Sequence, residues 1–456
     1  MKSLFDKLTA YADRHRISFA MPGHKGGRGL SEEFKSNIAR IDVTELADTE
    51  NLHAPKCELA EASKALAERF GAKESFFLTG GSTEGVHIML FCAVRGGKLL
   101  TNRTCHRSVI NAAVIAGFGV EFLRQEQDTG IMTPKPPTAE EVERALRESG
   151  DIAACIITSP DYYGHIADIE GIADVCHRAG IPLLVDEAHG AQLSADGMCG
   201  GAILHGADMA VQSAHKTLNA LNQAAFLHFN STLIDGASVR AMTAMVGTSS
   251  PSYPIVASAQ LALDGLTGSD WCDLCDYLDK KRTSLKERTK IVYPEGEVDR
   301  ARVVFGLSGY ELSGYEAEQI LRERYNIDVE MSDRYNVVCI VTPTNTREEI
   351  DLLFRAAEEI VRDVGYRNEP TYPEPPRPKT VMTPREAFWS KGENVGLTDA
   401  VGRVSRANVS AYPPGIAIIA AGEEITEEIA DYILKIEALG AEIEGMTDGK
   451  ISVSAK

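Results

Sequence analysis

The sequence predicts an α/β fold, with a large domain built on a mostly parallel sheet and a smaller C-terminal α/β domain. Several short apolar runs are continuous instead of alternating, which is typical of strands covered on both faces. These runs are Lys98–Asn102, Ile152–Ser159, Ile181–Ala188 and Asp208–His215. Helical patterns such as Thr138–Glu148 and Ile169–Ala179 separate them. This alternation indicates the βαβ order of a doubly wound sheet.

The length of 456 residues predicts two or three domains. Residues 1–70 are expected to form an N-terminal arm. Its start has the charge pattern of an amphipathic helix, and its MPGHKGG stretch (Met21–Gly27) suits neither a regular helix nor a strand. Residues 71–294 would form the large domain, and residues 295–456 the smaller C-terminal part. Within that part, residues 368–384 are so rich in proline that an extended connection is expected.

Composition excludes several classes of function. The net charge of -19, from 66 acidic and 47 basic residues, disfavours a nucleic-acid partner. The sequence has neither an apolar run long enough to cross a bilayer nor the apolar core of a signal peptide, so we expect a cytoplasmic protein without a membrane partner. The nine cysteines show no repeated spacing, and Cys272 and Cys275 lack a second ligand pair. No metal site is therefore predicted.

Lys216 lies in an unusual place, within the largely apolar stretch AVQSAHKTLNAL (Ala210–Leu221). Lysine is rarely buried without a partner, and a desolvated lysine lowers its pKa. Such an amine is a nucleophile that forms Schiff bases. The alternative is a lysine whose stem follows the surface while its ammonium stays in water. Taken alone, the segment does not decide between these interpretations.

Other polar residues also follow predicted strands, where ligands of open α/β sheets bind. Gly81, Ser82 and Thr83 begin a helix and could hold a phosphate, although the same residues are common helix caps. Asp186 could bind a ring nitrogen or cap a helix. His106 begins a helix after a strand, where its imidazole could face a cofactor ring. A phosphate site, an acid and a Schiff-base lysine together predict pyridoxal phosphate (PLP).

The chain resembles the bacterial Orn/Lys/Arg decarboxylases, which have the aspartate-aminotransferase fold (PLP fold type I). The resemblance rests on motifs spread over nearly the whole chain: MPGHKGG, TELADTENLHAP, GGSTEG, CHRS, SPDYYG, VDEAHGA, SAHKTLNALNQAA and AYPPGI. The pairing of MPGHKGG with SAHKTL is specific. The N-terminal wing domain of the large family members is missing, so the chain looks like a short form.

The resemblance implies a role for each matching residue. Lys216 would form the Schiff base, Asp186 would keep the pyridine nitrogen protonated, and His106 would stack on the ring. The catalytic residues would be Lys216, His106, Asp186 and His215. The residues binding the cofactor would be Gly81, Ser82, Thr83, His106, Asp186, Ala188, His189, Ser213, His215, Lys216, Thr248 and Ser249. Among these, Thr248 and Ser249 would reach the phosphate across the interface of a homodimer, and higher even-numbered assemblies also fit.

The implied reaction is decarboxylation of arginine, lysine or ornithine to an amine and CO2, and short relatives favour arginine. A carboxylate is expected at the distal end of the substrate, and Glu386 is the candidate. An equal alternative is that Glu386 is a first-turn helix acid. Gln192 and Asp161 depart from the family motifs and could line this distal end.

Two other functions stay open at this stage. The same cofactor also supports transaminases, lyases and oxidative decarboxylases, and the sequence does not show which substrate bond is held perpendicular to the ring. A PLP-binding protein that regulates without turnover is another possibility, which the intact Lys216, Asp186 and His106 set disfavours.

Overall fold

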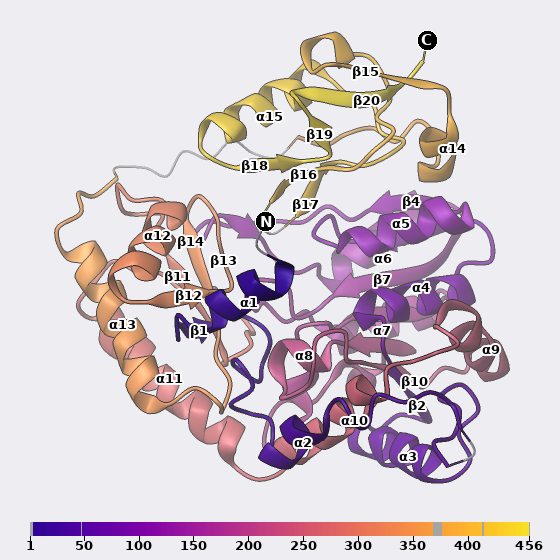
Figure 1. Cartoon of the computed structure of the whole chain (residues 1–456). Coiled ribbons are helices and arrows are strands. Elements are labelled where there is room, and N and C mark those ends of the chain that lie inside the picture. Colours follow the sequence, from indigo (N-terminus) through magenta and orange to yellow (C-terminus); the bar gives the residue numbers. More distant parts are fainter. Residues whose placement is uncertain (1–2, 47, 368–375, 413–414, 456) are drawn as a thin grey trace.

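The computed structural model describes residues 3–46, 48–367, 376–412 and 415–455. Its centre is a seven-stranded sheet of order β2-β10-β9-β8-β7-β3-β4 (Figure 1). Neighbours from β9 to β4 are parallel, and β10 is antiparallel to both of its neighbours. The strands are β2 (Glu74–Leu78), β3 (Lys98–Thr101), β4 (Gly119–Phe122), β7 (Ile152–Thr158), β8 (Leu183–Asp186), β9 (Met209–Gln212) and β10 (Ala225–Phe229). The predicted mostly parallel sheet is confirmed.

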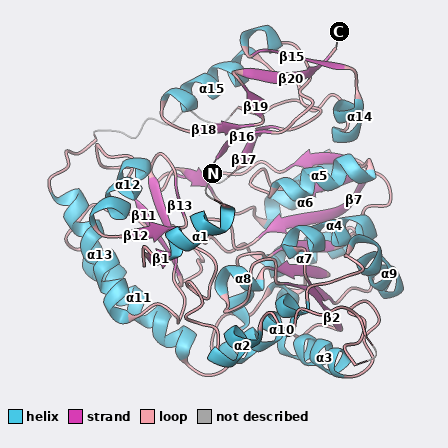
Figure 2. Cartoon of the chain, in the orientation of Figure 1, coloured by secondary structure: helices cyan, strands magenta, loops and turns pink. Residues whose placement is uncertain are grey.

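Helices cover both faces of this sheet (Figure 2). The helices of the large domain are α4 (Gly81–Ala93), α5 (Arg107–Ala116), α6 (Ala139–Glu148), α7 (Ile169–Arg178), α8 (Ala214–Thr217), α9 (Gly236–Val246) and α10 (Tyr253–Leu261). Ile156 of β7 packs into the hydrophobic cluster under α4, α5 and α9, whereas its neighbour Ile157 packs under α6 and α7. Because successive strand residues point to opposite faces, burial of both faces explains the continuous apolar runs.

The N-terminal arm reaches the small domain. It contains α1 (Leu4–Ala12), β1 (Ile17–Phe19), α2 (Glu32–Asn37) and α3 (Glu58–Phe70). Strand β1 pairs in parallel with β12 (Ile327–Val329). The MPGHKGG segment is irregular, as predicted, and its Lys25 is 3% exposed. The Lys25 amine donates hydrogen bonds to the carbonyls of Ala20 and Ile340, which fixes the segment against β14 (Asn336–Ile340).

The small domain is a three-stranded antiparallel sheet covered by helices. Its strands are β11 (Arg302–Gly306), β13 (Met331–Ser332) and β14, in the order β11-β14-β13. Its helices are α12 (Gly314–Arg324) and α13 (Arg347–Arg362), and the long α11 (Asp270–Lys286) leads into it. One hydrophobic cluster runs from α3 and α10 through α11 into this sheet. Shared packing therefore fixes β11 beside the large domain.

A further C-terminal unit has a core of its own. It contains α14 (Pro384–Trp389), β15 (Gly392–Gly396), β16 (Val409–Tyr412), β17 (Ile416–Ile419), α15 (Glu427–Ala438), β18 (Glu442–Glu444), β19 (Met446–Thr447) and β20 (Lys450–Ser454). It lies beside α5 (Figure 1). Residues 368–375 of the expected proline-rich connection, and Pro413 and Pro414 of AYPPGI, lie outside the described residues.

Across the described ranges, no helix combines the length and the apolar character that crossing a membrane requires.

Candidate active site

Lys216 lies just beyond the carboxyl end of β9, in the short helix α8. Its Nζ is 3.1 Å from Nε2 of His189 and 5.8 Å from the ring centre of Tyr162. Burial lowers the pKa of Lys216, and the charges of Asp186 and Glu330 only partly oppose this effect. A desolvated lysine with a lowered pKa is the expected state of an amine nucleophile.

Asp186 ends β8, the strand next to β9, and is 2% exposed. The backbone amide of Ala188 donates a hydrogen bond of 3.2 Å to its Oδ1. Burial raises the pKa of Asp186, and the charge of Lys216 opposes this rise. Because β8 and β9 are parallel neighbours, Asp186 and Lys216 emerge at the same edge of the sheet.

A place for a phosphate exists at the start of α4. No side chain caps this helix at Gly80; the Gly81 amide donates to the carbonyl of Gln223 at 2.9 Å, and the amides of Ser82 and Thr83 lack a capping side chain. Gly81 has a φ of +72°, and a Cβ added there would meet nothing within 4 Å. Ser82 is half-buried and Thr83 is exposed. An uncapped helix N-terminus next to free space suits an anion.

Two residues around α8 complete this phosphate site. Ser213 is fully buried, yet its Oγ has no hydrogen-bond partner among the described residues. A buried hydroxyl without a partner is unfavourable unless a ligand supplies one. His215 donates from Nδ1 to the carbonyl of Ala224 at 2.9 Å, and burial lowers its pKa to about 4. The neutral ring therefore has its proton on Nδ1. These residues fit the phosphate of PLP.

His106 caps α5, as its place after β3 predicts. Its Nδ1 accepts a hydrogen bond from the backbone amide of Ser108 and lies 2.8 Å from the hydroxyl of the same residue. Burial, and then the charges of Lys216 and Arg107, lower the pKa of His106 to about 4. Its imidazole is consequently neutral at physiological pH, as a ring that stacks on a cofactor should be.

Arg302, Tyr162 and Glu330 also belong to this site, and the sequence reasoning missed all three. Arg302 begins β11 of the small domain, and its Nη2 lies 3.0 Å from Nδ1 of His189. The Tyr162 ring packs against His189 with 4.8 Å between ring centres. The available signal was weak: Arg302 is one of several charged residues in the stretch DRARVVFG, just before an apolar run.

The two departures from the family motifs have structural roles. The Gln192 amide donates to the carbonyl of His189 at 3.0 Å and to Asp299 at 2.8 Å. Asp161 accepts from the buried His165, 3.0 Å away, whose other nitrogen lies 3.3 Å from Asp128. Gln192 therefore supports His189, and Asp161 supports the loop that carries Tyr162.

The remaining predicted residues are placed as follows. Ala188 is buried two residues after Asp186. Thr248 and Ser249 are exposed in the loop after α9, next to Gly247, where an added Cβ would be 2.9 Å from Glu84 of α4. Glu386 is exposed and forms a capping box with Thr383 at the start of α14. Hydrogen bonds from the Thr383 backbone and hydroxyl lower the pKa of Glu386. Its role toward a substrate stays a prediction.

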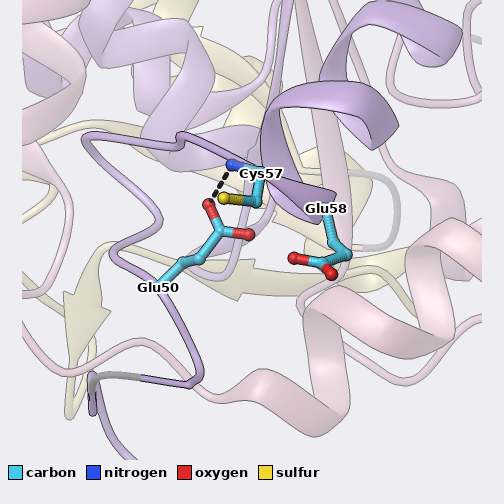
Figure 3. A group of neighbouring side chains, drawn as sticks. All are labelled: Glu50, Cys57 and Glu58. Atoms are coloured by element: carbon cyan, nitrogen blue, oxygen red, sulfur yellow. Dashed lines mark hydrogen bonds between the residues drawn. The ribbon is translucent and has the colours of Figure 1, made fainter.

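Glu50, Cys57 and Glu58 form a cluster of possible metal ligands at the start of α3 (Figure 3). The backbone amides of Lys56 and Cys57 donate to one oxygen of Glu50, and that of Leu59 donates to the other. These bonds lower the pKa of Glu50 to about 2. The carboxylate is thus used to fasten the N-terminus of the helix.

Comparisons with known proteins agree with this site. The family description "Orn/Lys/Arg decarboxylase, major domain" matches residues 2–293, and the C-terminal domain of the same family matches residues 369–449. Arginine decarboxylases of Bacillus anthracis and Bacillus subtilis are each 32% identical to the chain. Those alignments cover 98% of this chain and 95% and 96% of the two relatives.

Solved structures agree on the fold. The lysine decarboxylase of Francisella novicida has a TM-score of 0.77 at 18% identity, covering 98% of this chain and 80% of that one. The predicted PLP fold type I architecture is confirmed. With both family domains matched along the chain, this protein belongs to the Orn/Lys/Arg decarboxylase family.

Proposed function

We propose that this protein removes the α-carboxylate of a basic amino acid as CO2, with arginine as the favoured substrate and PLP as the cofactor. The observation that carries the proposal is the meeting of three groups at one sheet edge. They are the desolvated amine of Lys216, the buried carboxylate of Asp186, and the uncapped start of α4 beside the unpartnered Ser213. The full-length arginine decarboxylase relatives support arginine.

Different residues would bind different parts of PLP. The amine of Lys216 would bind its aldehyde carbon, and the first amides of α4 with Ser213 and His215 would bind its phosphate. The Asp186 carboxylate would hold a proton on the ring nitrogen. When bound, PLP supplies an electron sink for the electron pair that stays behind as CO2 departs.

Neutral histidines line the site as well. His106 and His189 both have pKa values far below the usual range, chiefly because of burial. Neither ring therefore adds a positive charge beside the protonated pyridine. The new amine needs a proton at Cα, and Lys216, freed by the substrate, or a neighbouring histidine would deliver it.

The direct test is product analysis. The purified chain with PLP is incubated separately with arginine, lysine and ornithine, and amines, CO2 and keto acids are measured by mass spectrometry. We expect agmatine and CO2 from arginine, and no keto acid. A keto acid or peroxide as the main product would replace decarboxylation with another PLP reaction.

A spectroscopic control tests the cofactor assignment. Lys216→Ala should abolish the visible absorbance band that PLP gives with the wild-type chain, whereas Lys73→Ala, on the surface, should retain it. A band that persists without Lys216 would contradict the assignment.

We also propose a cytoplasmic homodimer. The exposed Thr248 and Ser249 support this assembly, because their loop lies beside the first turn of α4 and leaves both side chains available to a second chain. The net charge of -19 is compatible with a protein of the cytoplasm.

A further inference from the structure

Arg302 is a buried cation that contacts the active site at the ring of His189 and at the backbone of Tyr162. Its side chain is 1% exposed, and the nearest carboxylate oxygen, of Asp299, is 4.0 Å from Nε. Its Nη2 lies 3.0 Å from Nδ1 of His189, and its Nη1 donates to the carbonyl of Tyr162 at 3.3 Å. A guanidinium so placed is held by its hydrogen bonds to the active-site loops and not by a close ion pair.

The chemistry of arginine fixes the state of His189. Arginine has only donors and stays charged, so the contact at Nδ1 must be an N–H of Arg302 donating to the ring. Nδ1 therefore has no proton, and the proton of the neutral imidazole is on Nε2. Burial and then the positive charges of Lys216 and Arg302 push the pKa of His189 well below its usual value, so the ring stays neutral.

The Nε2–H of His189 points to the lysine amine, 3.1 Å away. A donor facing Nζ needs a lone pair there, which only neutral lysine has. An ammonium would bring two donors together with no acceptor between them. The tautomer set by Arg302 thus favours the unprotonated form of Lys216.

We propose that Arg302 is a positioning residue that acts through His189 to keep the Lys216 amine neutral and ready to capture PLP. The inference rests on the proposed function, since it concerns the amine that binds the cofactor. In that capture the lone pair of Nζ attacks the aldehyde carbon, a C=N bond forms, and both amine protons leave with the aldehyde oxygen as water.

Other charged groups also act on this amine, from every element around it. They are Asp186 at the end of β8, Glu330 between β12 and β13, His106 before α5, His215 in α8, and Arg302 itself. Asp186 and Glu330 favour the ammonium. Burial is the largest effect that opposes them, and Arg302 and the tautomer of His189 act in the same direction.

The test measures PLP capture by the full-length chain stripped of cofactor. The rate at which the visible absorbance band appears is followed from about pH 6 to about pH 10. The midpoint of this rate profile reports the pKa of the Lys216 amine. We expect Arg302→Met, which leaves no donor for Nδ1 of His189, to raise this midpoint by about one pH unit, and so to slow capture about tenfold below it. Titration of PLP itself is common to all variants and cancels in the comparison.

Matched variants separate positioning from general damage. Arg302→Lys keeps the charge and a donor, so its midpoint should stay near that of the wild type. Arg282→Gln removes a side chain that binds the carbonyls of Arg300 and Arg302 without touching His189, and should leave the midpoint unchanged. Arg302→Leu provides a second neutral variant without a donor in case the methionine variant does not fold.

A double-variant cycle tests the route through His189. In a His189→Phe background, Arg302→Met should shift the midpoint by less than half as much. An equal shift in both backgrounds would mean a through-space charge effect and would overturn the proposal, as would an unchanged midpoint in the neutral variants. Absence of any band in the wild-type chain would instead count against the proposed function.

Discussion

At the scale of single residues, this site depends on ionisable groups that burial moves away from their usual charge. Lys216, His106, His189 and His215 all have lowered pKa values, with burial as the largest cause in each. Burial of such groups opposes folding, because water would stabilise their charged forms. They are suited to a site that has to donate and accept protons near neutral pH.

Ser213→Ala should weaken PLP binding by about tenfold, because a single hydrogen bond to the phosphate, ~1.5 kcal/mol when the partner is charged, is lost. Equilibrium dialysis or absorbance titration with PLP measures the change. Ser258→Ala is the control: Ser258 is equally buried, but its hydroxyl bonds Ile255 and Leu221 within the fold. The control should lower thermal stability and leave the PLP affinity unaltered. Equal PLP affinity in the wild type and Ser213→Ala would remove Ser213 from the phosphate site.

At the scale of elements, loops at the strand ends are fastened by buried polar contacts. The loop after β7 carries Tyr162 to the active site, and it is held by His165 between Asp161 and Asp128. Asp128 precedes the turn between β5 (Gln127–Asp128) and β6 (Thr133–Pro134), and also accepts from the backbone of Glu295. This triad ties two loops of the large domain to the chain that enters the small domain.

The triad predicts a pH-dependent contribution to stability. Burial works against the charge of His165, but the bonds from Asp128 and Asp161 outweigh it and raise its pKa to about 9. A folded pKa above the unfolded value of about 6.5 means that the stabilisation is complete below pH 6.5 and is lost as the pH rises through 9. Thermal unfolding should show a gap between the wild type and His165→Gln that narrows over this range.

The contribution of Asp128, the acid in the same triad, depends on pH in the opposite direction. Burial favours the neutral acid, yet the bonds from His165 and from backbone amides lower the pKa of Asp128 to about 2. Its contribution is therefore complete above its usual pKa of 3.8 and is lost as the pH falls through 2. Ser308→Ala, which removes a hydroxyl that donates to the carbonyl of Gly130 in the β5–β6 turn and carries no titratable group, should give a pH-independent gap. If the difference in stability between the wild type and His165→Gln also stays constant with pH, this would contradict the positive charge assigned to His165.

An ion pair between the partly buried Arg103 and the buried Glu423 helps to join the C-terminal unit to the large domain. Both terminal nitrogens of Arg103 donate to Glu423, at 2.6 and 2.7 Å, and the same guanidinium binds the carbonyls of Ala417 and Ile418. Glu423 is 1% exposed. Removal of one partner of a buried pair leaves a charge without compensation, which is strongly destabilising.

Arg103→Met should therefore lower the free energy of unfolding by about 3 kcal/mol in urea titrations. The double variant Arg103→Met with Glu423→Gln should recover part of this loss, because no buried charge remains. Arg107→Met breaks an exposed pair with Glu444 at the same junction and should change stability by less than about 1 kcal/mol. A double variant no more stable than Arg103→Met would mean that packing, not charge, makes this contact.

At the scale of the whole molecule, the large domain could be predicted because its strands are buried on both faces. This burial leaves a local signal in the sequence. The predicted runs Ile181–Ala188 and Asp208–His215 extend past the true ends of β8 and β9, at Asp186 and Gln212. Residues after those ends are also buried, so hydrophobicity alone does not mark where the chain turns to present Asp186, Ser213 and Lys216.

The contribution of the small domain could not be predicted in the same way. Arg302 and His189 are 113 residues apart in the chain, and their contact exists only because β11 packs beside the large domain. The tautomer of His189 depends on that contact. Glu386 shows the converse: a local pattern, the capping box, accounts for what its carboxylate does within one chain.

The proposed assembly predicts complementation between chains. A Lys216→Ala chain and a chain with Thr248→Glu and Ser249→Glu should each be inactive alone. If Thr248 and Ser249 reach the partner's phosphate, random hybrid dimers contain one intact site, and co-expression should restore roughly a quarter of the wild-type activity. No recovery in purified hybrids would place the action of both residues within their own chain.

The pairing of β1 with β12 has a consequence for synthesis. Residues 17–19 leave the ribosome early, but their partner strand is residues 327–329, so the first strand waits for more than two-thirds of the chain. The contact of Lys25 with the carbonyl of Ile340 waits equally long. The arm must stay unpaired while the large domain forms, and it can dock only after the small domain has emerged.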